Sequence, residues 1–142
     1  MSTSVELNTK GLDKFQNLLK TELKDLQVGV FDGKYPDGQT VPQVAFWNEY
    51  GTKKIQERPF MRQTANKKND IKNIVVDVMK KDLERGTISW KKIGLGMVDL
   101  MRKTIQSGTF AALAVSTVLR KQSRTPLIHT GEMLKRVRYR LK

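Results

Sequence analysis

Few side chains in this sequence are of a type and spacing that could carry out catalysis. The chain has a single histidine, His129, and no cysteine, which excludes a cysteine nucleophile, a disulfide framework and a thiolate zinc site. Ser107, Ser116 and Ser123 have only this distant histidine as a candidate base, and a serine hydroxyl needs such a base to become a nucleophile. We therefore expect that the protein is not an enzyme.

Acidic residues gather around Asp77, Asp82 and Glu84, as a carboxylate site for magnesium would require. Lysines and an arginine alternate with these acids, however, which is typical of a solvated helix face with offsetting charges. Gly94 and Gly96 lie inside a predicted helix, and no Gly-Lys-Ser or Gly-Lys-Thr element occurs, so no phosphate-binding loop is predicted. We expect neither a metal nor a cofactor.

Charge is the strongest signal in the composition. The 142 residues carry 27 Lys and Arg against 14 Asp and Glu, a formal net charge of +13. Residues 1–50 hold 5 basic and 7 acidic side chains, a net charge of −2, whereas residues 51–142 hold 22 and 7, a net charge of +15. Such asymmetry indicates a polyanion or an acidic protein surface as partner of the later part, although lysines and arginines also solvate exposed helices that have no partner.

The length predicts one domain across residues 1–142, because domains cluster at about 100–150 residues. The longest nearly apolar run, Phe110 to Leu119, is about half of what spans a bilayer. Residues Met1 to Lys10 lack the apolar stretch of a signal peptide. We expect a soluble protein that has no membrane partner.

Apolar periodicity, together with proline and glycine at segment ends, predicts five helices. They lie at Gly11–Asp25, Val41–Tyr50, Arg58–Gly86, Ser89–Ser107 and, from a shorter pattern, Ala111–Arg120. The third of these is predicted to bury a stripe made of Ile71, Ile74, Val75, Val78, Met79 and Leu83. The fourth carries Ile93, Met97, Leu100, Met101 and Ile105 on one face.

Two segments predict strands. Gln27–Phe31 is short, β-branched and followed by a turn signal. The terminal segment Arg136–Lys142 alternates basic and apolar residues, which places its apolar side chains on one face of a strand and its basic ones on the other. Pairing of these strands predicts an α+β fold, in which several amphipathic helices pack on a small antiparallel sheet that includes the C-terminal strand.

The helix predicted at Val41–Tyr50 carries three aromatic residues, Phe46, Trp47 and Tyr50. Three aromatics in five positions cannot all face one side of a helix, so at least one is expected to point outward or toward another chain. The alternative is that all three lie beneath the loop from Lys53 to Glu57. The first arrangement predicts an interface, and the second predicts a packed loop.

Two blocks of sequence extend this observation. The first runs from Asn48 to Thr52 (NEYGT) and continues from Arg58 to Arg62 (RPFMR), and the second runs from Pro126 to Leu134 (PLIHTGEML). In this order the blocks resemble the tail-completion and virion-morphogenesis (neck) proteins of long-tailed bacteriophages. That family has an Asn-Glu-Phe/Tyr-Gly-Thr … Arg-Pro-Phe block, followed by Pro-Leu-Ile-Asp-Thr-Gly-x-Leu before a closing strand. The resemblance covers about Gln27 to Leu141.

The sequence departs from the family pattern at two places. Gln56-Glu57 stands where the family has a proline-rich lead-in, and His129 stands where it prefers aspartate. Neither change alters the apolar framework, but the second removes the polar contacts that an aspartate would supply.

The resemblance implies a non-enzymatic structural protein of the virion neck or tail end, which joins head to tail. It implies assembly as a homo-oligomeric ring, in the host cytoplasm during morphogenesis and then in the virion. The implied partners are the neighbouring connector and the tail-terminator or tail-tube proteins. Duplex DNA would pass through the ring without sequence-specific contacts. The resemblance does not separate the tail-completion protein from another neck component.

Two groups of residues are candidates for these contacts. We expect interface or framework roles for Phe46, Trp47, Tyr50, Arg58 and Phe60. The arginines of the terminal strand, Arg136, Arg138 and Arg140, are candidates for a surface that faces DNA or an acidic neighbour, and the alternative is a solvated outer sheet face. A second class of function, a small non-specific nucleic-acid-binding protein, fits the same charge distribution.

Overall fold

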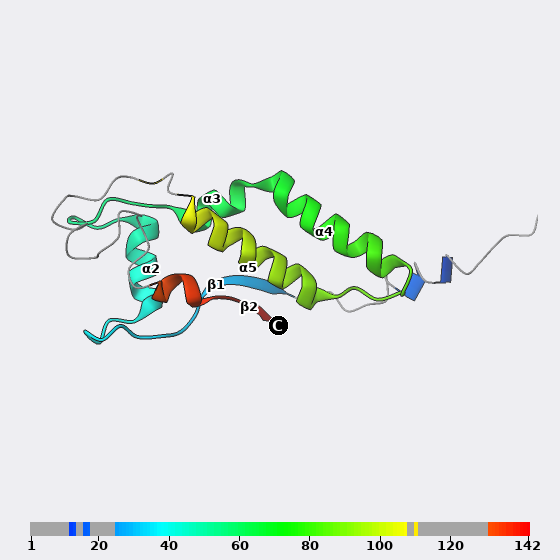
Figure 1. Ribbon diagram of the computed structural model, residues 1–142, viewed down its shortest axis with the longest axis horizontal. Helices are drawn as coiled ribbons and strands as arrows, with labels where there is room; N and C mark the ends of the chain where they lie inside the picture. The colour runs from blue at the N-terminus through cyan, green and yellow to red at the C-terminus, as the bar shows by residue number, and fades with distance from the viewer. Residues whose placement is uncertain (1–11, 14–15, 18–24, 108–109, 111–130) are drawn as a thin grey trace, which may run out of the picture.

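The structure, a computed structural model, describes residues 12–13, 16–17, 25–107, 110 and 131–142. Their elements, in chain order, are β1 (Leu26–Val30), α2 (Val41–Tyr50), α3 (Phe60–Asn66), α4 (Lys68–Leu83), α5 (Trp90–Gln106), α7 (Glu132–Lys135) and β2 (Val137–Leu141). Figure 1 shows α4 and α5 side by side as a long hairpin, with the two strands beside α5 and with α2 and α7 toward one end. The predicted α+β class is confirmed, including the C-terminal strand.

The sheet consists of β1 and β2, paired antiparallel. Its register places Val28 opposite Tyr139, and β1 lies one residue nearer the N-terminus than predicted. Beyond the strands, Asp25 and Lys142 exchange two backbone hydrogen bonds of 3.1 and 3.0 Å. The predicted pairing of these two segments is therefore confirmed, and it continues to the last residue.

Helix α5 packs on this sheet and also contacts α4. Two glycines permit the close approach: a Cβ at Gly94 would lie 2.6 Å from the Tyr139 ring, and a Cβ at Gly96 would lie 2.7 Å from Cγ2 of Ile74. Both distances are well below van der Waals contact, so a larger residue would force its neighbour to move. The glycines each cost the helix about 1 kcal/mol of propensity, and in return they let α5 approach β2 and α4 closely.

The long helix predicted from Arg58 to Gly86 is two helices in the structure, α3 and α4, which meet at Lys67. The stripe predicted to be buried on α4 is only partly covered, with Met79 and Leu83 exposed by 42% and 45%. That prediction was wrong because α4 packs chiefly against α5 alone (Figure 1). Asp82, predicted on a solvated helix face, is instead the buried residue of α4.

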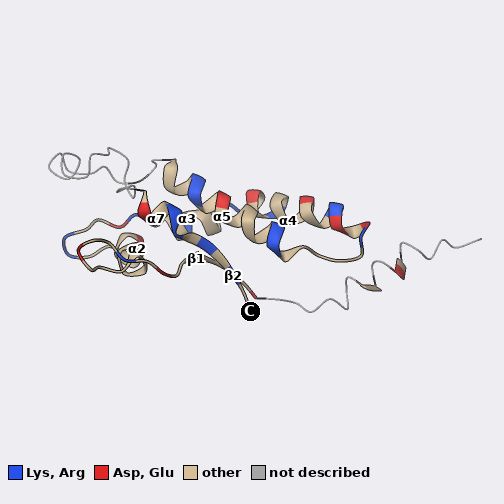
Figure 2. Ribbon diagram, turned by 60° about the horizontal axis from the view of Figure 1, so that its bottom comes forward, with Lys and Arg blue, Asp and Glu red and all other residues tan. Residues whose placement is uncertain are grey.

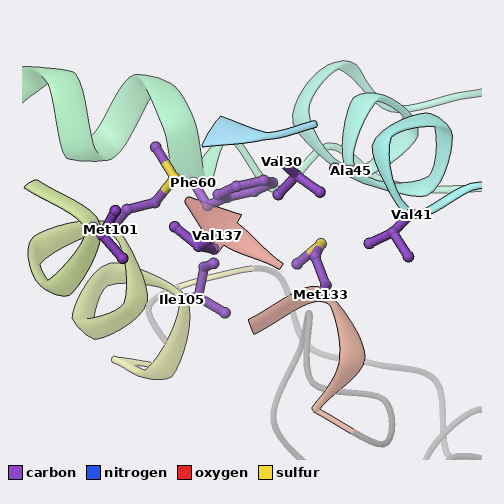
Figure 3. Packing of buried hydrophobic residues seen from close by; sticks show 9 residues of the cluster. Val30, Val41, Ala45, Phe60, Met101, Ile105, Met133 and Val137 are labelled. Carbon is purple, nitrogen blue, oxygen red and sulfur yellow. The ribbon is translucent and has the colours of Figure 1, made fainter. Parts of the chain in front are cut away.

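The core lies where α2, α3, α5, α7 and the sheet meet (Figure 3). Phe60, at the first position of α3, has no exposed surface and lies among side chains from the other elements. The core cluster consists of Val30, Val41, Ala45, Phe60, Val98, Met101, Ile105, Met133 and Val137. The face predicted for α5 is largely confirmed, with Ile93, Leu100, Met101 and Ile105 buried and Met97 half-buried.

Most residues of two predicted helices and of the second sequence block lie outside the described residues. Of the helix predicted at Gly11–Asp25, the structure describes Leu12–Asp13 and Gln16–Asn17, which are helical, and Asp25, which is not. The helix predicted at Ala111–Arg120 and the single histidine lie outside the described residues.

Candidate functional site

Helix α2 begins and ends at residues suited to those positions. The Oγ1 atom of Thr40 caps its start by accepting a hydrogen bond from the Gln43 N–H at 3.3 Å. Gly51 ends it with a φ of +72°, and a Cβ there would lie 3.0 Å from the Ile55 carbonyl oxygen. Glycine is therefore favoured both by the backbone angle and by the lack of space. The helix predicted at Val41–Tyr50 is confirmed with both of its ends.

A buried carboxylate joins α2 to α3. Glu49, the penultimate residue of α2, is 2% exposed and accepts hydrogen bonds from the N–H groups of Met61 (2.8 Å) and Arg62 (3.0 Å). These amides belong to the first turn of α3, where backbone N–H groups have no partner within their own helix. Glu49 therefore supplies the N-terminal cap of α3 from the preceding helix.

The side chain of Arg62 completes this connection. Its Nε–H donates to the Glu49 carboxylate at 3.0 Å, and one terminal nitrogen donates to the Glu49 backbone carbonyl at 2.6 Å and to Glu57 at 3.2 Å. Hydrogen bonds to the two carboxylates raise the pKa of Arg62. The NEYGT and RPFMR segments are thus joined by direct contacts between their side chains and backbones.

Two of the candidate interface or framework residues, Arg58 and Phe60, lie in the interior. The backbone N–H of Arg58 donates to the carbonyl of Asn48, and its guanidinium donates to the carbonyl of Gln56. Burial lowers the pKa of the Arg58 guanidinium. Both residues hold the α2–α3 loop against the core, and neither presents a large surface to a partner.

The aromatic residues of α2 divide between the surface and the interior. Phe46 and Tyr50 are 58% and 59% exposed, and their ring centroids lie 4.8 Å apart. The guanidinium carbon of Arg62 lies 5.4 Å from the centroid of the Tyr50 ring, within the range of a cation–π contact. Trp47 is half-buried. The prediction that at least one aromatic points outward is confirmed, and the alternative of three covered rings is wrong. We call the surface formed by Phe46, Tyr50 and Arg62 the aromatic patch.

The three arginines of the terminal segment are in different environments. Arg136, just before β2, is half-buried and pairs with Glu132 at 2.9 Å and Asp32 at 3.4 Å. The hydrogen bond that its guanidinium donates to the Glu132 carboxylate is the main cause of its raised pKa. Arg138 is 57% exposed and lies 3.9 Å from Asp32, and Arg140 is exposed and stacks on a phenylalanine ring. Arg136 therefore serves internal structure, while the other two arginines face solvent.

Sequence reasoning missed the residues that connect the elements. Glu49 and Arg62 both lie inside the first block, but neither was singled out, because a pattern of residue types does not show which acid is buried. Asp32, which faces two of the terminal arginines, belongs to the Asp-Gly turn signal that follows the first predicted strand. Its available signal was charge: it is an acid at the end of the strand that pairs with a basic strand.

The part of the chain that the structure describes contains neither a metal-binding cluster nor a membrane-spanning helix. No group of three or more His, Cys, Asp or Glu side chains there is arranged to hold a metal ion. None of the helices described there is both long enough and apolar enough to cross a membrane.

Comparison of the chain with protein-family models, with curated proteins and with solved structures found no match.

Proposed function

We propose that this protein is a structural subunit of the neck or tail end of a long-tailed bacteriophage, where it completes the tail or joins head to tail. Its partners are other copies of itself in a ring around the DNA path, and the adjoining connector and tail-terminator or tail-tube proteins. It acts in the virion, after assembly in the host cytoplasm. The proposal starts from the two sequence blocks, which resemble that family.

One structural observation supports it most directly, the exposure of the aromatic patch. Two large rings that are each more than half exposed are unfavourable in water and typical of protein contacts. The rings stand on a unit held by the buried Glu49, whose three hydrogen bonds fix α2 against α3. Aromatic and arginine side chains on a rigid support are the kind of anchor that dominates binding energy at interfaces.

The charge distribution agrees with a ring through which DNA passes. Lys and Arg recur along α4, α5 and β2 (Figure 2). Duplex DNA carries one negative charge per about 1.7 Å of its axis, so a basic inner surface of the ring would attract DNA of any sequence. Subunits that meet through unlike patches close into a ring when the rotation between neighbours allows it.

The proposal predicts that the aromatic patch is needed for self-association and for complete particles. Phe46→Ser with Tyr50→Ser should weaken self-association at least about tenfold, since buried aromatic anchors contribute roughly 2 kcal/mol or more. Light scattering on the purified chain measures the association. Electron micrographs of particles assembled without the gene, and with either version restored, measure joining of heads to tails.

A matched control is Leu95→Ser, which removes a side chain that is 52% exposed on α5. The control should associate and complement like the unchanged protein, and all variants should keep the unchanged helical circular dichroism. Normal joined virions in the absence of the gene would contradict the proposal, whatever the variants do.

The exposure of Arg138 and Arg140 also supports a second candidate, a small non-specific nucleic-acid-binding protein. This protein would bind duplex DNA as a monomer or dimer, with an affinity that falls steeply as salt rises. Light scattering measures the size of the species that binds DNA and so separates the two candidates. The second candidate is favoured if that species is a monomer or dimer and if its DNA affinity is unchanged when the aromatic patch is lost.

A further inference from the structure

The sheet has a second face, directed away from α5. In the register of β1 and β2, Gln27 is opposite Arg140 and Gly29 is opposite Arg138, so these four side-chain positions share one face. The alternate positions, among them Val28 and Tyr139, pack toward the core. Two arginines thus stand on the outer face of a two-stranded sheet.

One of these arginines, Arg140, lies over the ring of Phe31. The ring of Phe31 lies over Gly29, where an added Cβ would come within 3.9 Å of the ring atom Cζ. The guanidinium carbon of Arg140 lies 4.0 Å from the centroid of that ring. Stacking on an aromatic face orients a guanidinium while leaving its N–H groups directed outward at the edge, where they can donate to an oxyanion.

The acidic residues nearby do not neutralise this face. Asp32 lies 3.4 Å from Arg136 but 3.9 Å from Arg138, and the latter stays 57% exposed. No acidic side chain among the residues that the structure describes forms an ion pair with Arg140. Arg138 and Arg140 therefore remain available to an external anion.

We infer that Arg138 and Arg140 contact the phosphate groups of duplex DNA, and that Arg136 only supports the strand that carries them. This inference deepens the proposed function, on which it rests, by naming the chemical partner of the outer sheet face. Arginine donates to phosphate oxygens in a forked geometry that a stacked, pre-oriented guanidinium favours. Arg140 occupies a face of Phe31 on which a base of a single strand would otherwise stack, so backbone contact with a duplex is favoured.

The test is the salt dependence of binding to a short, fluorescently labelled duplex of random sequence. Each phosphate contact adds roughly 0.9 to the slope of log affinity against log salt. Replacing both residues (Arg138→Gln with Arg140→Gln) should lower the slope by about 2 and the affinity roughly tenfold or more near ~0.1 M salt. Arg138→Lys with Arg140→Lys should retain most of the slope, because lysine also neutralises phosphate.

The charge-matched control is Lys80→Gln with Lys81→Gln, which removes the same charge from exposed positions on α4. Its slope should be nearly unchanged. An equal loss in both double variants would overturn the inference, since it would show a general field effect. The inference would also be overturned if the protein bound poly-glutamate but not duplex DNA, because that result would indicate an acidic protein partner.

The readouts separate this inference from the proposed function. If the glutamine variant still assembles and joins heads to tails while its salt slope is unchanged, the DNA contact is wrong and the structural role stands. If particles join without the gene but the purified chain loses its salt slope on substitution, the structural role is wrong and the basic face still binds DNA.

Discussion

Two buried carboxylates, near the ends of α2 and α4, occupy equivalent positions but accept different numbers of hydrogen bonds from the helix that follows. Glu49 and Asp82 are each the penultimate residue of a helix, each is 2% exposed, and each accepts a hydrogen bond from the backbone at the start of the next helix. An acid near the C-terminus of a helix opposes the helix dipole, by about 0.3–1 kcal/mol. For both residues, hydrogen bonds from otherwise unpaired N–H groups at the start of the following helix offset this cost.

The difference lies in the number of donors. Glu49 accepts from two backbone amides and from the guanidinium of Arg62. Asp82 accepts from one amide, that of Ser89 at 2.6 Å, and has the ammonium of Lys92 at 3.8 Å. The α2–α3 connection, which carries the aromatic patch, is thus built more strongly than the turn between α4 and α5. A surface meant to meet a partner benefits from such a fixed support.

The largest effect is expected from Glu49→Gln. The amide can accept with one oxygen only, and its own NH₂ group would face the donors of α3, leaving buried N–H groups unpaired. The free energy of unfolding should fall by about 2–4 kcal/mol, the range for losing charged hydrogen bonds and leaving buried donors unsatisfied. Urea denaturation followed by circular dichroism measures this fall.

The exposed partner of the same arginine is the control. Glu57→Gln removes a carboxylate that is 57% exposed, and it should change stability by less than about 0.5 kcal/mol. If both glutamine variants cost the same, the buried hydrogen bonds of Glu49 are not what holds α2 to α3.

How far the sequence predicts this architecture depends on the kind of interaction. Local periodicity predicted α2, α5 and β2, because helix and strand repeats are visible within ten residues or so. It predicted the spacing of the stripe on α4 but not its exposure, since burial depends on how many elements pack against a helix. Alternation in β2 also predicted which side chains face outward, yet not that Arg136 is paired internally.

The buried acids could not be predicted in the same way. Asp82 follows Lys80 and Lys81 in the sequence and precedes Arg85, so it was interpreted as solvated, but its partner Ser89 lies seven residues later, beyond a turn. Glu49 meets donors twelve and thirteen residues away. The sequence places Gly94 inside a helix but does not show that it lies against the ring of Tyr139. In each case the missing information is a contact made only after the chain folds.

A smaller effect is expected from Asp82→Asn. The amide oxygen can still accept from the Ser89 N–H, so the main loss is the charge that faces Lys92. Stability should fall by about 1 kcal/mol, less than for Glu49→Gln, and a matched Asp77→Asn on the exposed side of α4 should change it hardly at all. Equal losses at Asp82 and Glu49 would remove the contrast between the two connections.

The smallest effect is expected from a substitution of Lys92, the cation that faces Asp82, and it is best compared with a substitution of Arg62, the cation that binds Glu49. Lys92 is 47% exposed and its ammonium is at the limit of an ion pair with Asp82, so Lys92→Met should cost less than about 0.5 kcal/mol, a cost that added salt reduces further. Arg62→Met should lower the thermal midpoint more than Lys92→Met does, because it removes hydrogen bonds to both the carboxylate and the backbone carbonyl of Glu49. Differential scanning calorimetry at low and high salt measures both changes. If the two substitutions lower the midpoint equally at every salt concentration, the Arg62 bonds act only as a surface ion pair, and the stronger support of the aromatic patch comes from the amides of α3 alone.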